Sequence, residues 1–555
     1  MIGAVPISYG EWKVRNVRDI SKWTLQDKLG QMLICGFDGK QPTVGIASLI
    51  RDYKLGGIVY FRRNIGSNDE IAALSAKLQA IAAEASNVPL TIAVDQEGGM
   101  VARIDGDVAL MPGNMAIGAT ENEKYAYETA RVTGAELREL GINMNFAPCL
   151  DVNNNAANPV IGVRSFGEVP EIVALLGKAA IAGYQASGVA PCAKHFPGHG
   201  DTTADSHYEL PVVAHSVERL NEVELAPFRA AIAAEADAIM TAHVRFPAYE
   251  PSGVPATLSR SVLTGLLREE LGYEGVIVTD CLEMKAISEG VGVAKGAVMA
   301  VQAGADLVLV SHLYERQKAA FEALYAAVLA GEISEARIDA SVARILRMKE
   351  LRCGNVQASE GAASSGRIGS EAHKAVAREV CEHAVTLVKN DNGAIPLRKD
   401  WSTLVIWPEV RESTEVVEII PQDMTLGKAL TAYLGDVEEI AVGLEPDEAE
   451  LASVLARTDS RSYKQIVIGT YNASFSPGQI RLVKRLLERN TAAPQAERAL
   501  ITAVSLRNPY DLEAFPQVDA YFACYENRPA MLEAFAKVAA GELPAKGALP
   551  VTLRI

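Results

Sequence analysis

The sequence is poor in cysteine and lacks long uncharged hydrophobic runs. Its seven cysteines form no Cys-x-x-Cys pair and lie mostly inside apolar runs such as MLICGF and YFACYE, which predicts buried thiols rather than a disulfide framework. The most apolar stretch of membrane-spanning length, residues 291–310, contains Lys295, Gln302 and Asp306, so we expect no membrane span. Charged residues stand near the amino end where a secretory signal needs an apolar segment. We therefore expect a cytoplasmic protein.

Positive charge is also in short supply. The chain has 53 Lys and Arg residues against 69 Asp and Glu residues, a net charge of -16. Because non-specific nucleic-acid binding depends on neutralising phosphates with basic side chains, this balance argues against a nucleic-acid partner. Hydrophobic residues make up 49% and charged residues 22% of the 555 positions, which excludes disordered, collagen-like and coiled-coil proteins.

Eight short apolar runs alternate with Ala-, Leu- and Glu-rich segments of helical spacing in the first two thirds of the chain. The runs cover residues 31–37, 55–61, 90–95, 144–152, 188–196, 236–244, 275–282 and 305–312. Near-continuous apolar strands that alternate with helices indicate a parallel sheet covered on its outer face. Eight such units in this length predict a (β/α)8 barrel of the TIM type. A doubly wound sheet is the second choice, because no GxGxxG motif follows the first run.

Polar residues gather at the carboxyl ends of these predicted strands. They are Asp38, Arg62, Asp95, Gln96, Glu97, Asp151, Lys194, His195, His243, Asp280 and His312. In a barrel these strand ends meet on one face, the face that carries active sites. Strand ends that simply lead into solvent would explain a few polar residues but explain less well a set so rich in His, Asp, Lys and Arg.

A Gly- and Ser-rich stretch divides the chain into two parts. It reads GNVQASEGAASSGRIGS and indicates a linker at 353–370. We therefore predict a barrel domain over 1–352 and a smaller α/β domain over 371–555. Further strand-like runs at 385–390, 402–407, 438–443, 465–471, 498–506 and 520–525 alternate with helical segments, which is typical of an αβα sandwich with a largely parallel sheet.

The densest polar stretch is residues 192–215, CAKHFPGHGDTTADSHYELPVVAH. Its Pro and Gly residues favour a loop over the barrel mouth. The loop supports two interpretations. One is a metal site, which would draw on His195, His199, Asp201, Asp205 and His207. The other is an Asp–His pair, because Asp205 and His207 are two residues apart and point the same way in extended chain. Such a carboxylate orients the imidazole for proton transfer near neutral pH.

Asp280 ends the seventh run. At the mouth of a barrel, this carboxylate can be a nucleophile, a base or a metal ligand, and it can equally cap the next helix. Paired with a proton donor across a sugar ring, it would complete a retaining glycosidase. Cys281 is a weak alternative nucleophile.

Three motifs together resemble glycoside hydrolase family 3, in its β-N-acetylglucosaminidase branch. They are VDQEGG at 94–99, KHFPGHGDT with the following DSH, and VTDCLEM at 278–284. The resemblance extends over the barrel and more weakly into the second domain, through AVTLVKND at 384–391 and the terminal LPVTL. This sequence has Thr279-Asp280-Cys281 where many relatives have Ser-Asp-Asp, but the nucleophile itself is present.

The resemblance implies a role for each matching residue. Asp280 would be the nucleophile that forms a covalent glycosyl-enzyme, and His207 the acid/base, oriented by Asp205. The sugar would be bound by Asp95, Arg103, Arg164, Lys194 and His195, although Arg103 and Arg164 can instead form structural ion pairs. His199 would shape the loop.

The implied activity is that of a retaining exo-β-N-acetylglucosaminidase. It would release N-acetylglucosamine from short glycans or cell-wall fragments and would need no metal and no cofactor. A small glycan is the only partner that the sequence predicts, and it indicates no oligomeric state. Phosphorolysis instead of hydrolysis, a β-glucosidase activity of the same family, a metal-dependent barrel hydrolase and a non-catalytic sugar-binding protein are the alternatives.

Overall fold

The structure, a computed structural model, describes residues 19–86, 88–203, 210–353, 366–411 and 422–555. These residues divide into two compact units, and neither unit is one stretch of sequence. The first lies within Met1–Asp95, Gly134–Pro148 and Ile181–Ile368, and the second within Gln96–Thr133, Cys149–Ala180 and Gly369–Ile555. The boundaries expected at 352 and 371 follow the chain rather than these units, and they stay a prediction. Most of the expected linker lies outside the described residues.

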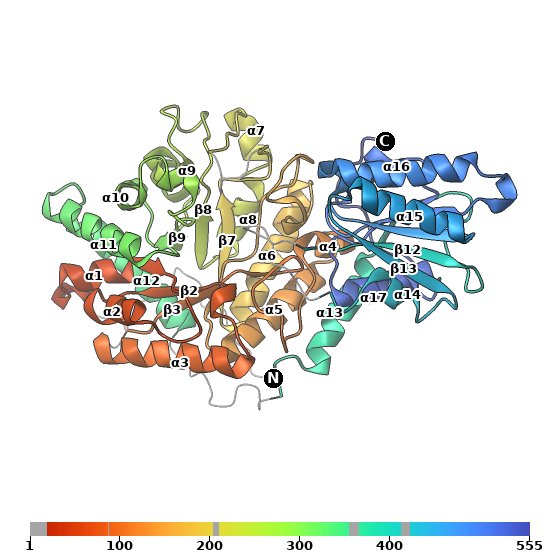
Figure 1. The fold of residues 1–555 in the computed structure, drawn as a ribbon. Coiled ribbons are helices and arrows are strands. Elements are labelled where there is room, and N and C mark those ends of the chain that lie inside the picture. Colours follow the sequence, from red (N-terminus) through yellow and green to blue (C-terminus); the bar gives the residue numbers. More distant parts are fainter. Residues whose placement is uncertain (1–18, 87, 204–209, 354–365, 412–421) are drawn as a thin grey trace. The chain divides into compact units, whose positions relative to one another are not determined.

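The first unit contains the predicted barrel (Figure 1). Its strands are β1 (Leu33–Cys35), β2 (Gly57–Tyr60), β3 (Thr91–Val94), β6 (Met144–Asn145), β7 (Ala190–Phe196), β8 (Ala238–Thr241), β9 (Val276–Val278) and β10 (Val308–Val310). They pair in parallel in the order β10-β1-β2-β3-β6-β7-β8-β9. A parallel bridge between Val278, in β9, and Leu307, just before β10, brings together the two ends of this order. Every strand residue is buried, as expected where helices cover a parallel sheet.

Helices connect the barrel strands along the chain. They are α1 (Leu25–Gln31), α2 (Val44–Asp52), α3 (Asn68–Ala85), α5 (Glu123–Glu139), α6 (Pro170–Ser187), α7 (Val217–Glu222), α8 (Ala226–Ala233), the π-helix η6 (Ser261–Glu270), α9 (Lys285–Ser288), α10 (Val293–Ala303), α11 (Tyr314–Leu329) and α12 (Glu335–Arg352). Local sequence sets their starts. At α3, for example, Ser67 and Glu70 form a reciprocal capping box. Within the described part of the chain, we find no helix with the length and apolar character that crossing a bilayer requires.

The second unit contains a six-stranded sheet between two layers of helices. The strands are β11 (Thr386–Asn390), β12 (Thr403–Pro408), β13 (Val437–Val442), β14 (Gln465–Thr470), β15 (Leu500–Ser505) and β16 (Ala520–Ala523). Their order is β11-β16-β15-β14-β12-β13, and all neighbours are parallel except β11 and β16. The strand order reverses between β12 and β14, as it does in doubly wound sheets.

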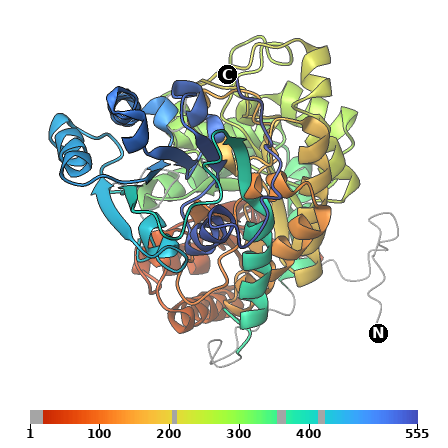
Figure 2. The same cartoon turned by 90° about the vertical axis from the view of Figure 1, so that its right-hand side faces the viewer.

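Alternating side chains of the central strands form the two cores of this sheet. Val405 and Trp407 pack with α13 (Glu371–Ala384), α14 (Leu426–Leu430) and α17 (Pro529–Ala539). Leu404 and Ile406 pack on the opposite face with α15 (Glu448–Ser460) and α16 (Pro477–Ala492). Both helix layers are visible in Figure 1 and again in the turned view of Figure 2. The predicted αβα sandwich is therefore confirmed.

Two segments that lie between barrel strands in the sequence, here called excursions, belong to the second unit: Gln96–Thr133 and Cys149–Ala180. The first contains the hairpin of β4 (Gln96–Gly98) and β5 (Val101–Ala102), followed by α4 (Asn114–Thr120). The second contains the short 3-10 turn η4 (Gly162–Arg164). Two residues of the predicted site, Arg103 and Arg164, lie on these excursions.

Candidate active site

Asp95 and Lys194 form an ion pair in the barrel unit. Asp95 directly follows β3, and Lys194 lies on β7. The Lys194 Nζ is 2.7 Å from Asp95 Oδ1, and the two side chains are 2% and 19% exposed. The pairing of β7 with β8 shifts register between Ala193 and Phe196, at the position of Lys194 and His195. Such irregularities re-aim side chains next to active sites. The structure thus brings together two of the predicted sugar-binding residues.

Asp280 stands two residues after the end of β9 and is half-buried. Its Oδ1 accepts a hydrogen bond from the N–H of Cys281 at 2.7 Å, which fixes the carboxylate. The next helix, α9, has Met284 at its N-cap position, so Asp280 does not cap it. Burial raises the pKa of the Cys192 thiol on β7, and the charges of Lys194, Asp95 and Asp280 all act on that thiol. The three ionisable groups therefore gather near one point of the barrel.

Two buried side chains hold the segment around Asp280. His243 faces the Thr257 hydroxyl through Nδ1 at 2.8 Å and the Cys281 carbonyl oxygen through Nε2 at 2.9 Å. The Thr279 hydroxyl accepts the N–H of Leu309 at 2.9 Å, from the next strand of the barrel. The residues on both sides of Asp280 are thus tied to neighbouring strands, so the carboxylate is preorganised.

Cys281 does not have the properties of a nucleophile. Burial raises the pKa of its thiol to about 11, which keeps it protonated near neutral pH. Its sulfur lies within 4.8 Å of ligand atoms of Glu283 and His312, so these three residues are a possible metal-binding group. However, Glu283 already accepts the backbone N–H groups of His312 and Leu313. A metal would have to displace those hydrogen bonds, and we assign it no role.

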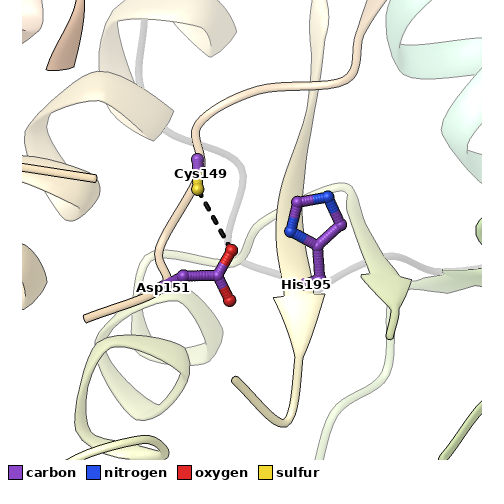
Figure 3. A group of neighbouring side chains, drawn as sticks. All are labelled: Cys149, Asp151 and His195. Atoms are coloured by element: carbon purple, nitrogen blue, oxygen red, sulfur yellow. Dashed lines mark hydrogen bonds between the residues drawn. The ribbon is translucent and has the colours of Figure 1, made fainter. Parts of the chain in front are cut away.

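Arg164 forms a bidentate ion pair in the second unit. Its Nε lies 3.0 Å from Glu97 Oε2 and its Nη2 lies 2.8 Å from Glu97 Oε1, with both side chains almost fully buried. Burial by itself lowers the pKa of Arg164, but the charge and hydrogen bonds of Glu97 reverse this and raise it. Asp151, which accepts a hydrogen bond from the Cys149 thiol at 3.1 Å, adds to the effect (Figure 3). Arg164 therefore stays charged, as binding a polar ligand requires.

The remaining loop residues have structural partners or fall outside the described chain. His195 projects from β7 and is 6% exposed (Figure 3). His199 contacts the Thr202 hydroxyl through Nδ1 at 2.9 Å, consistent with shaping the loop, and Asp201 binds His215 Nε2 at 2.6 Å. The proposed metal ligands His199 and Asp201 thus have separate partners. Asp205 and His207 lie outside the described residues.

Comparison with known proteins identifies the family. A model of the glycosyl hydrolase family 3 N-terminal domain matches residues 24–348. The chain belongs to glycosyl hydrolase family 3. It is therefore a glycoside hydrolase, and the resemblance drawn from its motifs is confirmed.

Three relatives illustrate the similarity of this family 3 enzyme to known proteins. β-Hexosaminidase A of Pseudoalteromonas piscicida is 35% identical over 560 residues, which cover 92% of this chain and 91% of the relative. The β-N-acetylglucosaminidase/β-glucosidase of Cellulomonas fimi is 29% identical over 573 residues, or 99% and 97% of the two chains. The solved structure of a family 3 β-N-acetylglucosaminidase from Paenibacillus sp. str. FPU-7 has 50% identity and a TM-score of 0.91, and covers 95% and 99% of the two chains.

The sequence alone indicates no role for two residues that hold parts of the candidate site. Glu97 was one of several polar strand-end residues, and its partner Arg164 is 67 positions away. His243 was another, and its position gave no sign that it holds Cys281. Arg103 directly follows β5, is 7% exposed and remains a predicted sugar-binding residue.

Proposed function

We propose that this family 3 enzyme is a retaining exo-β-N-acetylglucosaminidase, with Asp280 as its nucleophile. The observation that carries the proposal is the half-buried Asp280 carboxylate, which the Cys281 N–H holds in place. It lies near the Lys194–Asp95 pair, because the charges of all three residues act on the Cys192 thiol. The names of the relatives point to the same substrate class, because they include β-hexosaminidases and β-N-acetylglucosaminidases. The product would be N-acetylglucosamine, released from the non-reducing ends of short glycans or cell-wall fragments.

The reaction proceeds in two displacements at the anomeric carbon. Asp280 attacks this carbon and forms a glycosyl ester, while the bond to the leaving oxygen breaks and that oxygen receives a proton. Water then attacks the same carbon, loses a proton to the base and releases the aspartate. The hydrogen bond from the Cys281 N–H holds the carboxylate in place through both steps. We assign the proton transfers to His207, oriented by Asp205, on the family motif that these residues match.

Binding of the sugar is assigned to the polar residues that match the family motifs. Asp95 presents a carboxylate for sugar hydroxyl groups, and its ion pair with the Lys194 ammonium at 2.7 Å holds that carboxylate in place. Arg164, His195 and Arg103 complete the proposed set. Four of the five assigned residues are of basic type, namely Arg103, Arg164, Lys194 and His195, which suits a negatively charged substrate. A neutral imidazole as acid/base fits the same picture, because it does not repel an anion as a second carboxylate would.

The enzyme is proposed to act on cell-wall fragments in the cytoplasm. The state of its cysteines supports this location, because all seven are free and buried, as the composition predicted. Reduced thiols of this kind are usual in the cytosol.

A panel of aryl glycosides tests the proposed function. We expect hydrolysis of the aryl β-N-acetylglucosaminide and of a muropeptide disaccharide, much slower cleavage of the β-glucoside, and no sugar 1-phosphate under excess phosphate. Asp280→Ala should abolish turnover, whereas Cys281→Ser should retain it. Near-normal activity of Asp280→Ala would overturn the assignment. Equal cleavage of glucosides would indicate a β-glucosidase, and formation of sugar 1-phosphate a phosphorylase.

A further inference from the structure

The segment that carries Glu97 is held by residues that follow strand β16. The N–H of Gly113 donates to Glu526 Oε2 at 2.9 Å, and Arg528 Nε donates to the carbonyl oxygen of Gly99 at 2.8 Å. Glu526 and Arg528 are 2% and 4% exposed, so both contacts are made away from solvent. The Arg528 guanidinium is charged, and a buried hydrogen bond that involves a charged side chain is expensive to lose, because the remaining partner stays desolvated.

The glycines beside Glu97 permit this close approach. Gly98 and Gly99 have φ angles of +96° and +53°, in the region that side chains rarely adopt. A Cβ atom on Gly99 would lie 2.5 Å from Glu526 Oε2. The absence of a side chain at Gly99 is therefore what allows this backbone to lie against Glu526.

The turn that carries Arg164 is held in a similar way. The N–H of Val163 donates to Asn508 Oδ1 at 3.0 Å. Gly162 has a φ of +43°, and a Cβ atom there would lie 2.3 Å from the same Asn508 oxygen. Asn508 follows β15 and is 4% exposed. The backbone just before Arg164 is thus hydrogen-bonded to the Asn508 amide, and it packs too closely against that amide for a side chain at position 162.

These contacts lie around the Glu97–Arg164 pair. Glu97, Arg164 and Glu526 line one small cavity of about 10 Å³, the room that a single water molecule needs. Asn508 and Glu526 both stand just beyond the carboxyl ends of parallel strands, the edge at which doubly wound sheets usually bind ligands. In this protein the polar groups of that edge bind backbone of the same chain.

We propose that Asn508, Glu526 and Arg528 are positioning residues that set the place of the Glu97–Arg164 pair and thereby the affinity for the sugar. This inference rests on the proposed function, in which Arg164 binds the substrate. It gives the C-terminal sheet a role in binding although no residue of the sheet acts on the glycosidic bond. A displacement of a binding group by about 1 Å is enough to cost one to two orders of magnitude in activity.

Two independent variants test the proposal. Asn508→Ala removes the acceptor for Val163, and Arg528→Met removes the donor to Gly99 while keeping an apolar stem. We expect each to raise KM for an aryl N-acetylglucosaminide about tenfold, with kcat within about threefold of the wild type. The conservative Asn508→Asp keeps an acceptor oxygen, so it should retain a near-normal KM even if it melts at a lower temperature.

Gln465→Ala is the matched control. The Gln465 side chain is 1% exposed and accepts the N–H of Arg398 at 3.0 Å, at the amino end of β14 and therefore at the opposite edge of the sheet from Asn508. Its loss should lower stability and leave KM unchanged. In an Arg164→Ala background, Asn508→Ala should add no further loss of N-acetylglucosamine affinity, measured by calorimetry, because its effect passes through Arg164.

The outcomes separate this inference from the proposed function. If the wild type does not hydrolyse the aryl N-acetylglucosaminide, the proposed function fails. If the wild type is active and both variants keep the wild-type KM, or if Gln465→Ala raises KM equally, the positioning role fails. If Asn508→Ala does not fold, Arg528→Met and Asn508→Asp decide the question.

Discussion

His243 Nε2 lies 2.9 Å from the carbonyl oxygen of Cys281, the residue that follows Asp280. A carbonyl oxygen can only accept a hydrogen bond, so Nε2 carries the proton. This leaves Nδ1 facing the Thr257 hydroxyl at 2.8 Å. The ring is fully buried and both of its nitrogens are engaged, so it is set up to hold backbone rather than to exchange protons with substrate.

Replacing His243 should therefore slow the reaction while leaving binding intact. In His243→Ala the Cys281 carbonyl loses its donor and the Asp280 carboxylate loses part of its support. We expect kcat to fall between tenfold and a hundredfold, with KM within about threefold. His243→Gln, which can still donate to the carbonyl, should recover much of kcat. An unchanged kcat in His243→Ala would show that the backbone needs no such support.

The Lys194–Asp95 pair should contribute to stability and to binding in separable ways. Lys194→Met leaves the Asp95 carboxylate largely buried without its cation, which should cost roughly 3 to 5 kcal/mol of unfolding free energy. Adding Asp95→Asn removes the second charge and should restore most of that stability. Activity should stay low in the double variant, because the proposed sugar contacts are gone. Denaturant unfolding and hydrolysis rates measure the two effects. Recovery of activity along with stability would assign the pair a structural role only.

The assignment of His207 as acid/base predicts a dependence on the leaving group. An acid is needed most when the departing oxygen is a poor leaving group. His207→Ala should therefore reduce hydrolysis of a disaccharide far more than hydrolysis of an activated aryl glycoside. Rates on the two substrates, each relative to the wild type, give the comparison. Equal losses on both would count against an acid role.

The eight barrel strands could be predicted because each is buried on both sides, so that each is a continuous apolar run of its own. The run at 236–244, for example, contains β8. The β4–β5 hairpin was not predicted, since its strands have only three and two residues and an apolar pattern needs more. What holds the hairpin is the Gln96 amide, which pairs with the backbone of Ile104 in both directions. Such a side-chain contact leaves no repeating pattern of apolar residues in the sequence from which it could be predicted.

Candidate site residues can be singled out in the sequence where a strand end or a motif marks them, as with Asp95, Lys194 and Asp280, and their roles stay predictions. Their partners were less accessible, because pairs such as Glu97 and Arg164 are far apart in sequence. The loop shows the same limit. Spacing singled out Asp205 and His207, whereas the described pair of Asp201 and His215 forms only because the chain returns after 14 residues. The spacing of neighbouring residues does not predict that Asp201 and His215 come into contact.

The ion network around Asp306 should stabilise the barrel without affecting the reaction. Asp306 is fully buried just before β10, at the amino ends of the strands, and pairs with Arg268. Arg337 and Arg344 approach it at 3.5 Å each, and the Ser341 hydroxyl donates to it at 2.6 Å.

Asp306→Ala should lower the unfolding free energy by roughly 3 to 5 kcal/mol, because it leaves several guanidinium groups without their anion. It should leave kcat and KM unchanged below the melting temperature, since active sites of such barrels lie at the opposite ends of the strands. Glu322→Ala, which breaks an exposed pair with Lys318, is the control and should melt like the wild type. A loss of kcat in folded Asp306→Ala would mean that the two ends of the barrel are coupled.

Asp511 should make the second unit less stable as the pH rises. The side chain lies in the turn η10 (Pro509–Ala514), is fully buried, and accepts the N–H of Ser474 at 3.1 Å. Burial raises the pKa of its carboxyl from 3.8 to about 6. Between these two values the folded protein holds a proton that the unfolded chain has lost, so the unfolding free energy falls with increasing pH and levels off above about pH 6.

A pKa difference of about two units between the folded and unfolded states corresponds to about 3 kcal/mol of unfolding free energy. Asp511→Asn cannot lose a proton, and its amide oxygen can still accept from Ser474. The variant should therefore gain stability relative to the wild type as the pH rises from about 4 to 6, and keep that gain at higher pH. Unfolding by denaturant at several pH values, with wild type and variant compared at each, isolates this one group from the other carboxylates. A difference between the two proteins that does not change with pH would place the Asp511 pKa near its ordinary value and remove the prediction.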